Sequence, residues 1–533
     1  MRILTANLFA AVQQSTGVLD TASKAPQHAI PPVGGVCAAE SGSVSHAHAG
    51  RFRTLLPLLL LTVFAILIQG YHPGAEDDGI YLPAILQDLN PHLFPHNSGF
   101  FRTQTQGTIF DHVIAGSIRM THLPVAWATL IWQFLAILLV LWGCLRIARF
   151  CFREVHAQWA GVSLVAVLLA LPVTYTGLFL VDENLHPRTL ATAAILAAIA
   201  AVLERRWWLA ALLLAVACAF HPIMGPLGIS YCVFLGYSQR RKNAEGRRTI
   251  AAMLPLAAFF HPASPVAKQA LSIHDVHFLS HWTWYEWLGV VGPTILLWWF
   301  SRMARRSGSD SLERVSRSAV YFGFFQLAVA LCIMLPQSLM QLRPLQPMRY
   351  LHIFYLLLVL LGGGLIGQRL LRRKVYRWAI LFVPLCAGMF YAQCHLYAGT
   401  EHLELPGQSS KNPWLQAFTW IRTNTPVDAY FALDPLYLRL PGEDFHGFRA
   451  LAQRSSMADV IKDSSVVTIM PQLGPEWQKQ TAAEAGWQHF RKNDFDRLHR
   501  EFGVNWVVVA APAAEGLTCP YRNSAVFVCR LGP

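Results

Sequence analysis

The sequence predicts a polytopic α-helical membrane protein, with about eleven transmembrane helices and a small C-terminal α/β domain outside the cytoplasm. Three observations support this prediction. The 533-residue chain is 54% hydrophobic and only 14% charged, whereas a soluble protein carries about 25% charged residues. Its apolar residues form eleven blocks between Arg51 and Thr400. Clusters of basic residues recur in every second connection between these blocks.

Six of the apolar blocks are the clearest candidates for membrane spans. With their flanks, each is long enough to cross a hydrocarbon layer of about 30 Å as a helix. One isolated block could be a buried core helix, but a long series is typical of a membrane protein. Residues 249–260 are nearer a half-span and are expected to be tilted or re-entrant. The six clear blocks are residues 54–69, 125–145, 159–180, 321–335, 352–366 and 378–391.

Charge placement predicts the orientation of the chain. The positive-inside rule assigns the Arg- and Lys-rich connections to the cytoplasm. Eleven spans then place the N-terminus inside and the C-terminus outside. The formal net charge of +13 comes from the membrane part and its cytoplasmic connections, because residues from Glu401 onward carry 13 basic and 14 acidic side chains. Nucleic-acid binding is therefore not indicated, and the lipid bilayer is the first expected partner.

Composition divides the chain into three predicted regions. Residues 1–50 are rich in Ala, Ser and Gly and are expected to be a disordered cytoplasmic tail. Residues 51–398 form the transmembrane domain, with a large first outer loop at 71–122. Residues 399–533 form the extracytoplasmic domain. This last region lacks a Gly-rich phosphate loop and a nucleophile elbow, so we expect it to act as a lid or docking module rather than as a separate enzyme.

The outer domain is predicted to alternate strands with helices. Residues 412–423 have an amphipathic helical pattern that Asn424-Thr425-Pro426 ends. Strands are expected at 429–433, 465–470 and 504–510, and helices at 475–490 and 494–502. Cys519 and Cys529 flank a turn-like stretch, so a hairpin would bring them together. Both a disulfide and two free thiols are compatible with this spacing.

The first outer loop carries the strongest functional signal. Glu76, Asp77 and Asp78 are consecutive carboxylates at the outer end of the first span. Like charges this close repel one another unless a cationic or protic partner offsets them. We therefore favour a general base or a cation-binding carboxylate that faces a cavity at the membrane surface. The alternative is a solvated acidic loop that helps to set topology.

The second outer loop adds Asp182, Glu183 and His186 as candidate substrate-binding residues. The same residues could instead cap the helix that Pro187 begins. Arginine suits a diphosphate or phosphate ligand through its bidentate geometry. Among the outer cations we favour Arg349, with Arg102 and Lys268 as further candidates, although snorkelling to lipid headgroups explains Arg349 equally well.

Histidines gather on the predicted outer side. His72, His186, His221 and His261 each precede a proline. A converging subset could bind a divalent cation, but no histidine pair has the helical i, i+4 spacing with an intervening acid that marks a zinc site. The favoured interpretation is that these rings end helices at the interface. The sequence thus indicates no firm cofactor or metal ligand, and a divalent cation remains an alternative.

The motif Asp77-Asp78-x-x-Tyr81 resembles the Asp-Glu-x-x-Tyr pattern of the GT-C superfamily of polytopic glycosyltransferases. The resemblance implies a lipid-linked sugar donor, Asp77 as the base that deprotonates the acceptor, and a substrate-binding role for Tyr81. Asp78 replaces the usual Glu, which leaves its catalytic role less defined. Most of the chain also resembles an uncharacterised family of bacterial polytopic proteins, which implies a bacterial inner membrane. Segments 72–83, 220–222, 345–349 and 420–429 carry that second resemblance.

These observations lead to one functional hypothesis and two alternatives. The hypothesis is a glycosyltransferase that moves a sugar from a polyprenyl-phosphate donor to an acceptor on the outer face. A transporter or flippase of lipid-linked or sugar substrates would also explain the spans, although ionisable residues at the middle of spans are few. A non-catalytic envelope scaffold is the other alternative. An outer cavity lined by Asp77, Asp182 and Arg349 would favour transfer, whereas a midplane cavity would favour transport.

Overall fold

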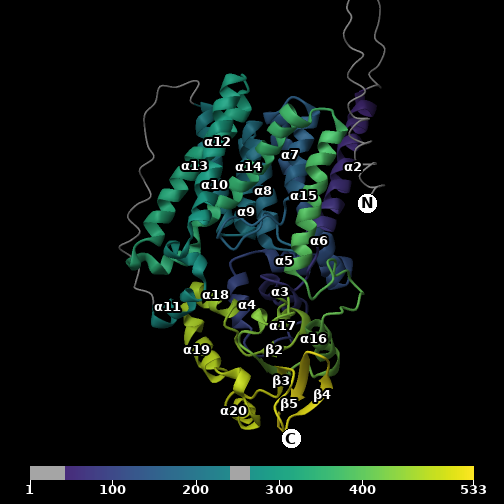
Figure 1. The fold of residues 1–533 in the computed structure, drawn as a ribbon, viewed down its shortest axis with the longest axis vertical. Helices are drawn as coiled ribbons and strands as arrows, with labels where there is room; N and C mark the ends of the chain where they lie inside the picture. The colour runs from purple at the N-terminus through teal and green to yellow at the C-terminus, as the bar shows by residue number, and fades with distance from the viewer. Residues whose placement is uncertain (1–42, 241–263, 533) are drawn as a thin grey trace, which may run out of the picture.

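The computed structural model describes residues 43–240 and 264–532, and it stacks a helical bundle on a smaller mixed part (Figure 1). The short helices of the first outer loop lie between the two. The bundle contains α2 (Ser43–Gln69), α6 (Val125–Cys151), α7 (Val155–Val167), α8 (Pro187–Leu203), α9 (Trp207–Phe220), α10 (Met224–Arg240), α12 (Trp284–Arg306), α13 (Asp310–Met334), α14 (Tyr350–Ile366) and α15 (Val375–Leu396).

By length and composition, four helical stretches of the described residues can cross a membrane. They are α6, α13, Pro347–Leu371 and α15, and four shorter apolar helices accompany them. A multi-pass membrane protein is thus supported, but the predicted count of eleven spans is not confirmed. The half-span at 249–260 lies outside the described residues. The predicted tail at 1–50 lies there too, apart from residues 43–50, which belong to α2.

The predicted span at 159–180 is wrong in its second half. Helix α7 ends at Val167, and the chain then runs without helix to His186. Pro172 and Gly177 (φ +67°) lie in this stretch and favour a turn, which the bond from Val173 N–H to Leu178 O closes at 2.8 Å. Leu169 and Leu180 are fully buried. Irregular backbone at this depth is tolerated because surrounding protein, not lipid, covers it.

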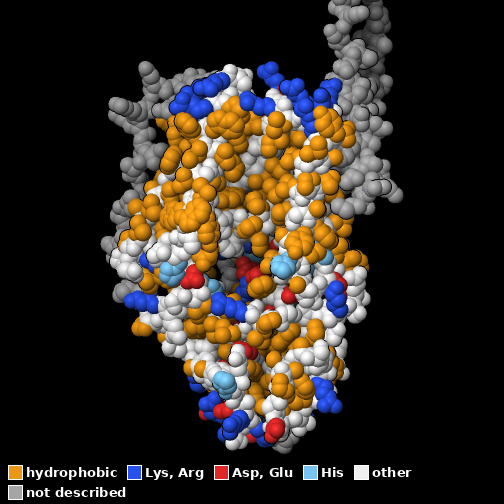
Figure 2. Space-filling model, in the orientation of Figure 1, with side chains coloured by type: hydrophobic (Ala, Val, Ile, Leu, Met, Phe, Trp, Pro, Cys, Tyr) orange, Lys and Arg blue, Asp and Glu red, His pale blue; other side chains and the backbone are white. Residues whose placement is uncertain are grey.

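Side-chain types divide the surface along the same axis. Figure 2 shows a broad hydrophobic band across this face of the bundle, with Lys and Arg side chains at the end opposite the sheet. Charged side chains of both signs appear again at a hollow between the band and the outer part. By the positive-inside rule the basic end would face the cytoplasm, and this orientation stays a prediction.

Three helices of the first outer loop form a platform under the bundle. They are α3 (Asp78–Leu89), α4 (Gly99–Thr105) and α5 (Phe110–Thr121). Tyr81 and Ile85 of α3 pack with Phe110 and Ile114 of α5 in one apolar cluster. Further along the chain, α11 (Pro265–Ser272) contacts the outer part. The platform thereby fixes the N-terminus of α3, where the acidic motif lies.

The outer part is a five-stranded sheet with helices on both faces. Strand order is β2-β1-β3-β5-β4, parallel across β2-β1-β3 and antiparallel across β3-β5-β4. Phe418 packs on one face, and Phe495 and Leu498 pack on the other. The strands are β1 (Tyr430–Leu433), β2 (Ser455–Ser456), β3 (Trp506–Ala510), β4 (Thr518–Arg522) and β5 (Val526–Arg530); the helices are α16 (Pro413–Asn424), α17 (Phe448–Ala452), α18 (Lys462–Ile469), α19 (Gly474–Ala483) and α20 (Lys492–Phe502).

Most predicted elements of the outer part are confirmed. Helix α16 begins where Asn412 Oδ1 accepts the Trp414 N–H at 2.8 Å, and β1, β3, α20 and the final hairpin lie where expected. A disulfide joins Cys519 to Cys529 across that hairpin. The predicted strand at 465–470 is wrong, because α18 occupies these residues. Asp459 Oδ1 accepts the N–H groups of Lys462 and Asp463, which starts a helix there.

Candidate active site at the boundary with the outer domain

The acidic motif lies where the first outer loop meets the outer domain. The side chains of Glu76 and Asp77 are each 40% exposed, so both carboxylates reach the boundary. Asp78, the first residue of α3, is only 4% exposed, and its Oδ2 accepts the Gly74 N–H at 2.7 Å. Burial raises the pKa of Asp78 to about 7. Asp77 is therefore the accessible carboxylate of the predicted catalytic pair, whereas Asp78 braces the loop from inside.

Lys462 of the outer domain supplies the counter-charge. Its Nζ lies 2.8 Å from Glu76 Oε2 and 3.1 Å from Asp77 Oδ1. Burial alone would raise the pKa of Asp77, but Lys462 and His186 outweigh it and hold that pKa well below its usual range. Asp77 is thus an ionised carboxylate with one oxygen on the lysine.

The other oxygen of Asp77 faces His186. His186 Nε2 lies 3.6 Å from Asp77 Oδ2, and the side chain is 2% exposed. His186 Nδ1 accepts the Arg188 N–H at 2.9 Å, so the neutral ring carries its proton on Nε2, toward Asp77. Burial and the charge of Arg188 lower the pKa of His186, which favours this neutral form. Tyr81 orients the ring through an edge contact at 4.8 Å between centroids.

Arg188 and Arg349 form a cationic wall beside these residues. Arg188 holds Asp182 through Nε (3.2 Å) and Nη2, while its Nη1 is buried and has no hydrogen-bond partner. Burial raises the pKa of Tyr81 to about 12, with Asp77 adding to the effect and Arg188 and Arg349 opposing it. The charges of both arginines therefore act on the Tyr81 hydroxyl. Arg188 pairs with Asp182, whereas Arg349 has no carboxylate partner among the described residues. The wall therefore has positive charge available for an anion.

His221 completes the wall. It is 6% exposed, and its ring centroid lies 6.3 Å from that of His186. Burial and the charge of Arg349 hold the pKa of His221 well below its usual range. The ring is therefore neutral and can donate a hydrogen bond without adding to the positive charge.

The structure brings together most, but not all, of the predicted site residues. Arg102 lies elsewhere, with its Nη1 2.5 Å from Asp88 Oδ1. Lys268 is exposed on α11. Glu183 is buried behind Asp182, and burial raises its pKa to about 8. The residues gathered at the boundary are Glu76, Asp77, Tyr81, Asp182, His186 and Arg349.

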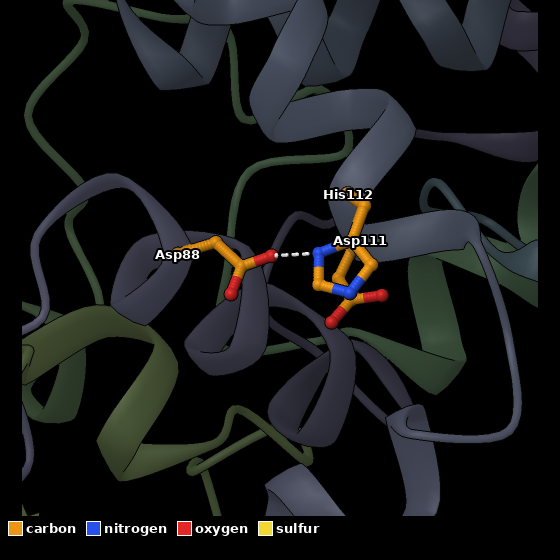
Figure 3. Close-up of side chains that lie close together, drawn as sticks. All are labelled: Asp88, Asp111 and His112. Carbon is orange, nitrogen blue, oxygen red and sulfur yellow. Dashed lines mark hydrogen bonds and ion pairs between the residues drawn. The ribbon is translucent and has the colours of Figure 1, made fainter.

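A metal ion does not fit between Asp77 and His186 as these side chains are bonded. The nitrogen of His186 that faces Asp77 carries the ring proton, so it has no lone pair to give. Arg188 occupies both oxygens of Asp182, and Lys462 occupies Asp77 Oδ1. Among the described residues, the group whose donor atoms do converge is Asp88, near the C-terminal end of α3, with Asp111 and His112 of α5 (Figure 3).

The loop and the outer domain are tied by main-chain and side-chain bonds. Glu76 N–H donates to Phe445 O at 2.9 Å, and Gly447 N–H donates to Gly74 O at 2.8 Å. Glu404 accepts from His72 at 2.8 Å and from His446 at 3.0 Å. A small recess lined by Gly79, Tyr437 and Lys462 among others lies at this junction. The outer domain consequently forms one side of the candidate site.

Sequence reasoning missed Lys462. The misread strand at 465–470 hid the start of α18, and the lysine reaches the motif across 385 residues of sequence. A local signal was present, because Asp459 followed by Asp463 is typical of a helix start. That signal would have indicated the helix but not its docking on Asp77.

Comparisons with known proteins give weak similarities only. No family model and no curated protein matches the chain. A structure of the archaeal oligosaccharyltransferase AglB of Archaeoglobus fulgidus, in complex with an inhibitory peptide and a dolichol-phosphate, is 11% identical, covers 86% of this chain and 69% of its own, and gives a TM-score of 0.45. The oligosaccharyltransferase of the same organism with Zn and sulfate is 11% identical, with coverages of 85% and 67% and a TM-score of 0.40.

Proposed function

We propose that this protein is a membrane glycosyltransferase that moves a sugar from a polyprenyl-phosphate donor to an acceptor hydroxyl on the outer face. One observation carries the proposal: an accessible, ionised carboxylate, Asp77, lies beside a cationic wall that contains a buried guanidinium N–H of Arg188 without a partner. A base and an anion site are the two parts that such a transfer requires.

The donor phosphate would lie against Arg188 and Arg349. Arg349 stands at the start of the apolar stretch Pro347–Leu371, where a lipid-linked phosphate would reach it from the bilayer. Its Nε donates to Gln346 Oε1, and this contact holds the guanidinium at the bundle's outer end. Among the described residues no ion pair of Arg349 with a carboxylate is found, so its charge is available to an anion.

Asp77 would act on the acceptor. As the acceptor oxygen attacks the anomeric carbon, its proton passes to Asp77, and the new C–O bond forms while the bond from that carbon to the phosphate oxygen breaks. The electron pair leaves with the phosphate, whose developing charge the arginines stabilise. In-line attack of this kind inverts the anomeric configuration. Lys462 would orient Asp77 and give way as the acceptor enters.

Transport is the less favoured alternative. The hollow in Figure 2 and the recess beside Gly79 both lie at the outer boundary, not at the middle of the hydrophobic band. A site at the boundary suits transfer between a membrane-bound donor and an outer acceptor.

Two measurements on the purified full chain in lipid nanodiscs test the proposal. Native mass spectrometry with polyprenyl phosphate and, separately, with the unphosphorylated polyprenol should show preference for the phosphate. That preference should be lost in Arg349→Ala and kept in His92→Ala, which removes an exposed outer histidine. Equal binding of both lipids would contradict the anion site.

The second measurement follows transfer from polyprenyl-phosphate-linked sugars. Asp77→Asn should lower the rate by about 100-fold to 10,000-fold, the usual contribution of a general base. Normal product from Asp77→Asn would overturn the proposed role.

A further inference from the structure

A second cluster of chemically active side chains lies on the first outer loop, away from Asp77. One donor atom from each of Asp88, Asp111 and His112 lies within 4.8 Å of the others. In the part of the chain that the structure describes, no other three His, Cys, Asp or Glu side chains converge in this way. Asp88 lies ten residues beyond Asp78 on α3, about 15 Å along the helix axis. Figure 3 shows the Asp111 carboxylate beneath the His112 ring, with Asp88 facing the same ring.

Asp111 gives the observation that points to a ligand. The residue is 2% exposed, and its Oδ1 has no hydrogen-bond partner. The nearest guanidinium nitrogen, Nη1 of Arg102, lies 3.8 Å from Oδ2, which is too far for a hydrogen bond. A buried carboxylate oxygen without a partner is costly, so it takes up either a proton or a cation.

Asp88 and His112 provide the rest of a coordination set. His112 Nδ1 lies 2.6 Å from Asp88 Oδ2, and the imidazole is 68% exposed while the carboxylate is 8% exposed. The exposed side leaves a coordination position for water. The ring can also turn without disturbing the core. Two carboxylates and one neutral imidazole suit Zn²⁺ and similar divalent ions in charge and in ligand type.

We propose that Asp88, Asp111 and His112 bind one divalent transition-metal ion of the Zn²⁺ class. The ion would take the place of the proton on His112 Nδ1, and the neutral ring would carry that proton on Nε2 instead. Ligand atoms on a tetrahedral zinc ion are about 3.3 Å apart, so His112 Nδ1 and Asp88 Oδ2 would move apart from 2.6 Å, and the wider separations, up to 4.8 Å, would close. By joining α3 to the first turn of α5, the ion would hold the platform under the bundle. This inference does not depend on the proposed glycosyl transfer.

Arg102 is the competitor for this site. Its guanidinium lies 2.5 Å from Asp88 Oδ1 and is 35% exposed, so it can turn out to solvent when the ion enters. Removing that charge should strengthen binding. A gain of this kind cannot come from misfolding, which makes Arg102→Gln an informative variant.

The experiment uses the full chain in nanodiscs, stripped with a chelator and dialysed against ZnCl₂, with bound zinc quantified by mass spectrometry. The parent should bind one zinc ion. The affinity for this ion should fall at least about tenfold in Asp111→Asn and in His112→Ala, but not in His92→Ala. Arg102→Gln should bind it more tightly. Unchanged zinc binding in Asp111→Asn and His112→Ala, or no binding by the parent, would overturn the proposal.

Asp77→Asn separates this site from the proposed active site. It should lose transfer and still bind the ion. Loss of the ion in Asp77→Asn would place the metal at the motif and overturn the assignment to Asp88, Asp111 and His112. The zinc measurement needs no activity, so the two proposals can fail independently.

Discussion

Lys462 Nζ lies 3.1 Å from Asp77 Oδ1, so the outer domain places a cation on the accessible carboxylate of the first outer loop. The lysine side chain is 15% exposed, and it also contacts Glu76 at 2.8 Å. Burial alone would lower the pKa of Lys462, but the two carboxylates outweigh it and raise that pKa. The lysine is therefore charged at neutral pH. The pKa of Asp77 consequently depends on whether the outer domain, which carries this lysine, is docked on the loop.

Replacing Lys462 should shift the pH profile of transfer. In Lys462→Met, burial of Asp77 is opposed by fewer positive charges, so the pKa of Asp77 rises toward or above its usual range. The acid limb of the rate profile should move to higher pH, with the rate below the limb falling about tenfold for each unit of pKa gained. Rates measured from pH 4 to 8 would show the shift. Lys411→Met, on an exposed lysine of the same domain, is the control, and an identical profile in both variants would contradict the idea.

The close contact between Gly447 and Gly79 should also be sensitive to substitution. A Cβ added at Gly447 would lie 2.6 Å from Gly79 Cα, so Gly447→Ala must push the outer domain off the start of α3. Overpacking of this kind costs about 1–3 kcal/mol. We expect faster hydrogen exchange at residues 74–79 and lower transfer. Gly116→Ala, where the added atom meets nothing within 4 Å, should behave like the parent, and equal exchange in both variants would count against the contact.

What could be predicted from the sequence was local. The amphipathic pattern of residues 412–423 and the cap at Asn412 fix α16 without reference to the rest of the chain. The three adjacent carboxylates at a span's end drew attention to the loop, and the choice of Asp77 among them came from the resemblance to the GT-C motif. Residues 465–470 were misread, since Val466 and Val467 favour a strand by propensity and docking of α18 overrides it.

The remainder of the site depends on tertiary contacts. Arg102 was an attractive anion ligand because it lies on the outer side, but α3 and α4 direct it to Asp88. Lys462 and the partnerless Nη1 of Arg188 follow from how the outer domain and the second outer loop pack around α3. Spacing along the chain carries no information about either contact.

A buried ion pair should decide the stability of the outer domain. Arg449 donates to Asp463 Oδ1 at 2.8 Å and to Oδ2 at 2.7 Å, and both residues are buried. Arg449→Met leaves the Asp463 carboxylate buried without a cation, which costs about 3–5 kcal/mol. Hydrogen exchange of β1 and β3 in the intact protein should rise accordingly. Arg422→Met, on an exposed arginine, should leave exchange unchanged, and the prediction fails if the two variants match.

Docking of the outer domain should weaken as pH rises from 5 to 7. Burial raises the pKa of Asp78 to about 7, so the docked state binds a proton that the free loop releases above its ordinary carboxyl pKa. Burial lowers the pKa of His446, but Glu404 outweighs it and the net shift is upward. A raised histidine pKa stabilises docking fully below the ordinary value and loses that effect as pH passes the raised one. His72, whose pKa burial lowers, opposes these two groups below about pH 6.5.

The variant that isolates this effect is Asp78→Asn. It keeps the size of the side chain and an oxygen that can accept the Gly74 N–H, but it cannot lose a proton. The reporter is the amide of Gly447, which donates to Gly74 O at 2.8 Å across the junction. After correction for the intrinsic pH dependence of exchange, its protection should fall from pH 5 to 7 in the parent and fall clearly less in Asp78→Asn. An equally steep fall in the variant would show that Asp78 does not carry the linkage, and His446→Gln would then test whether the histidine does.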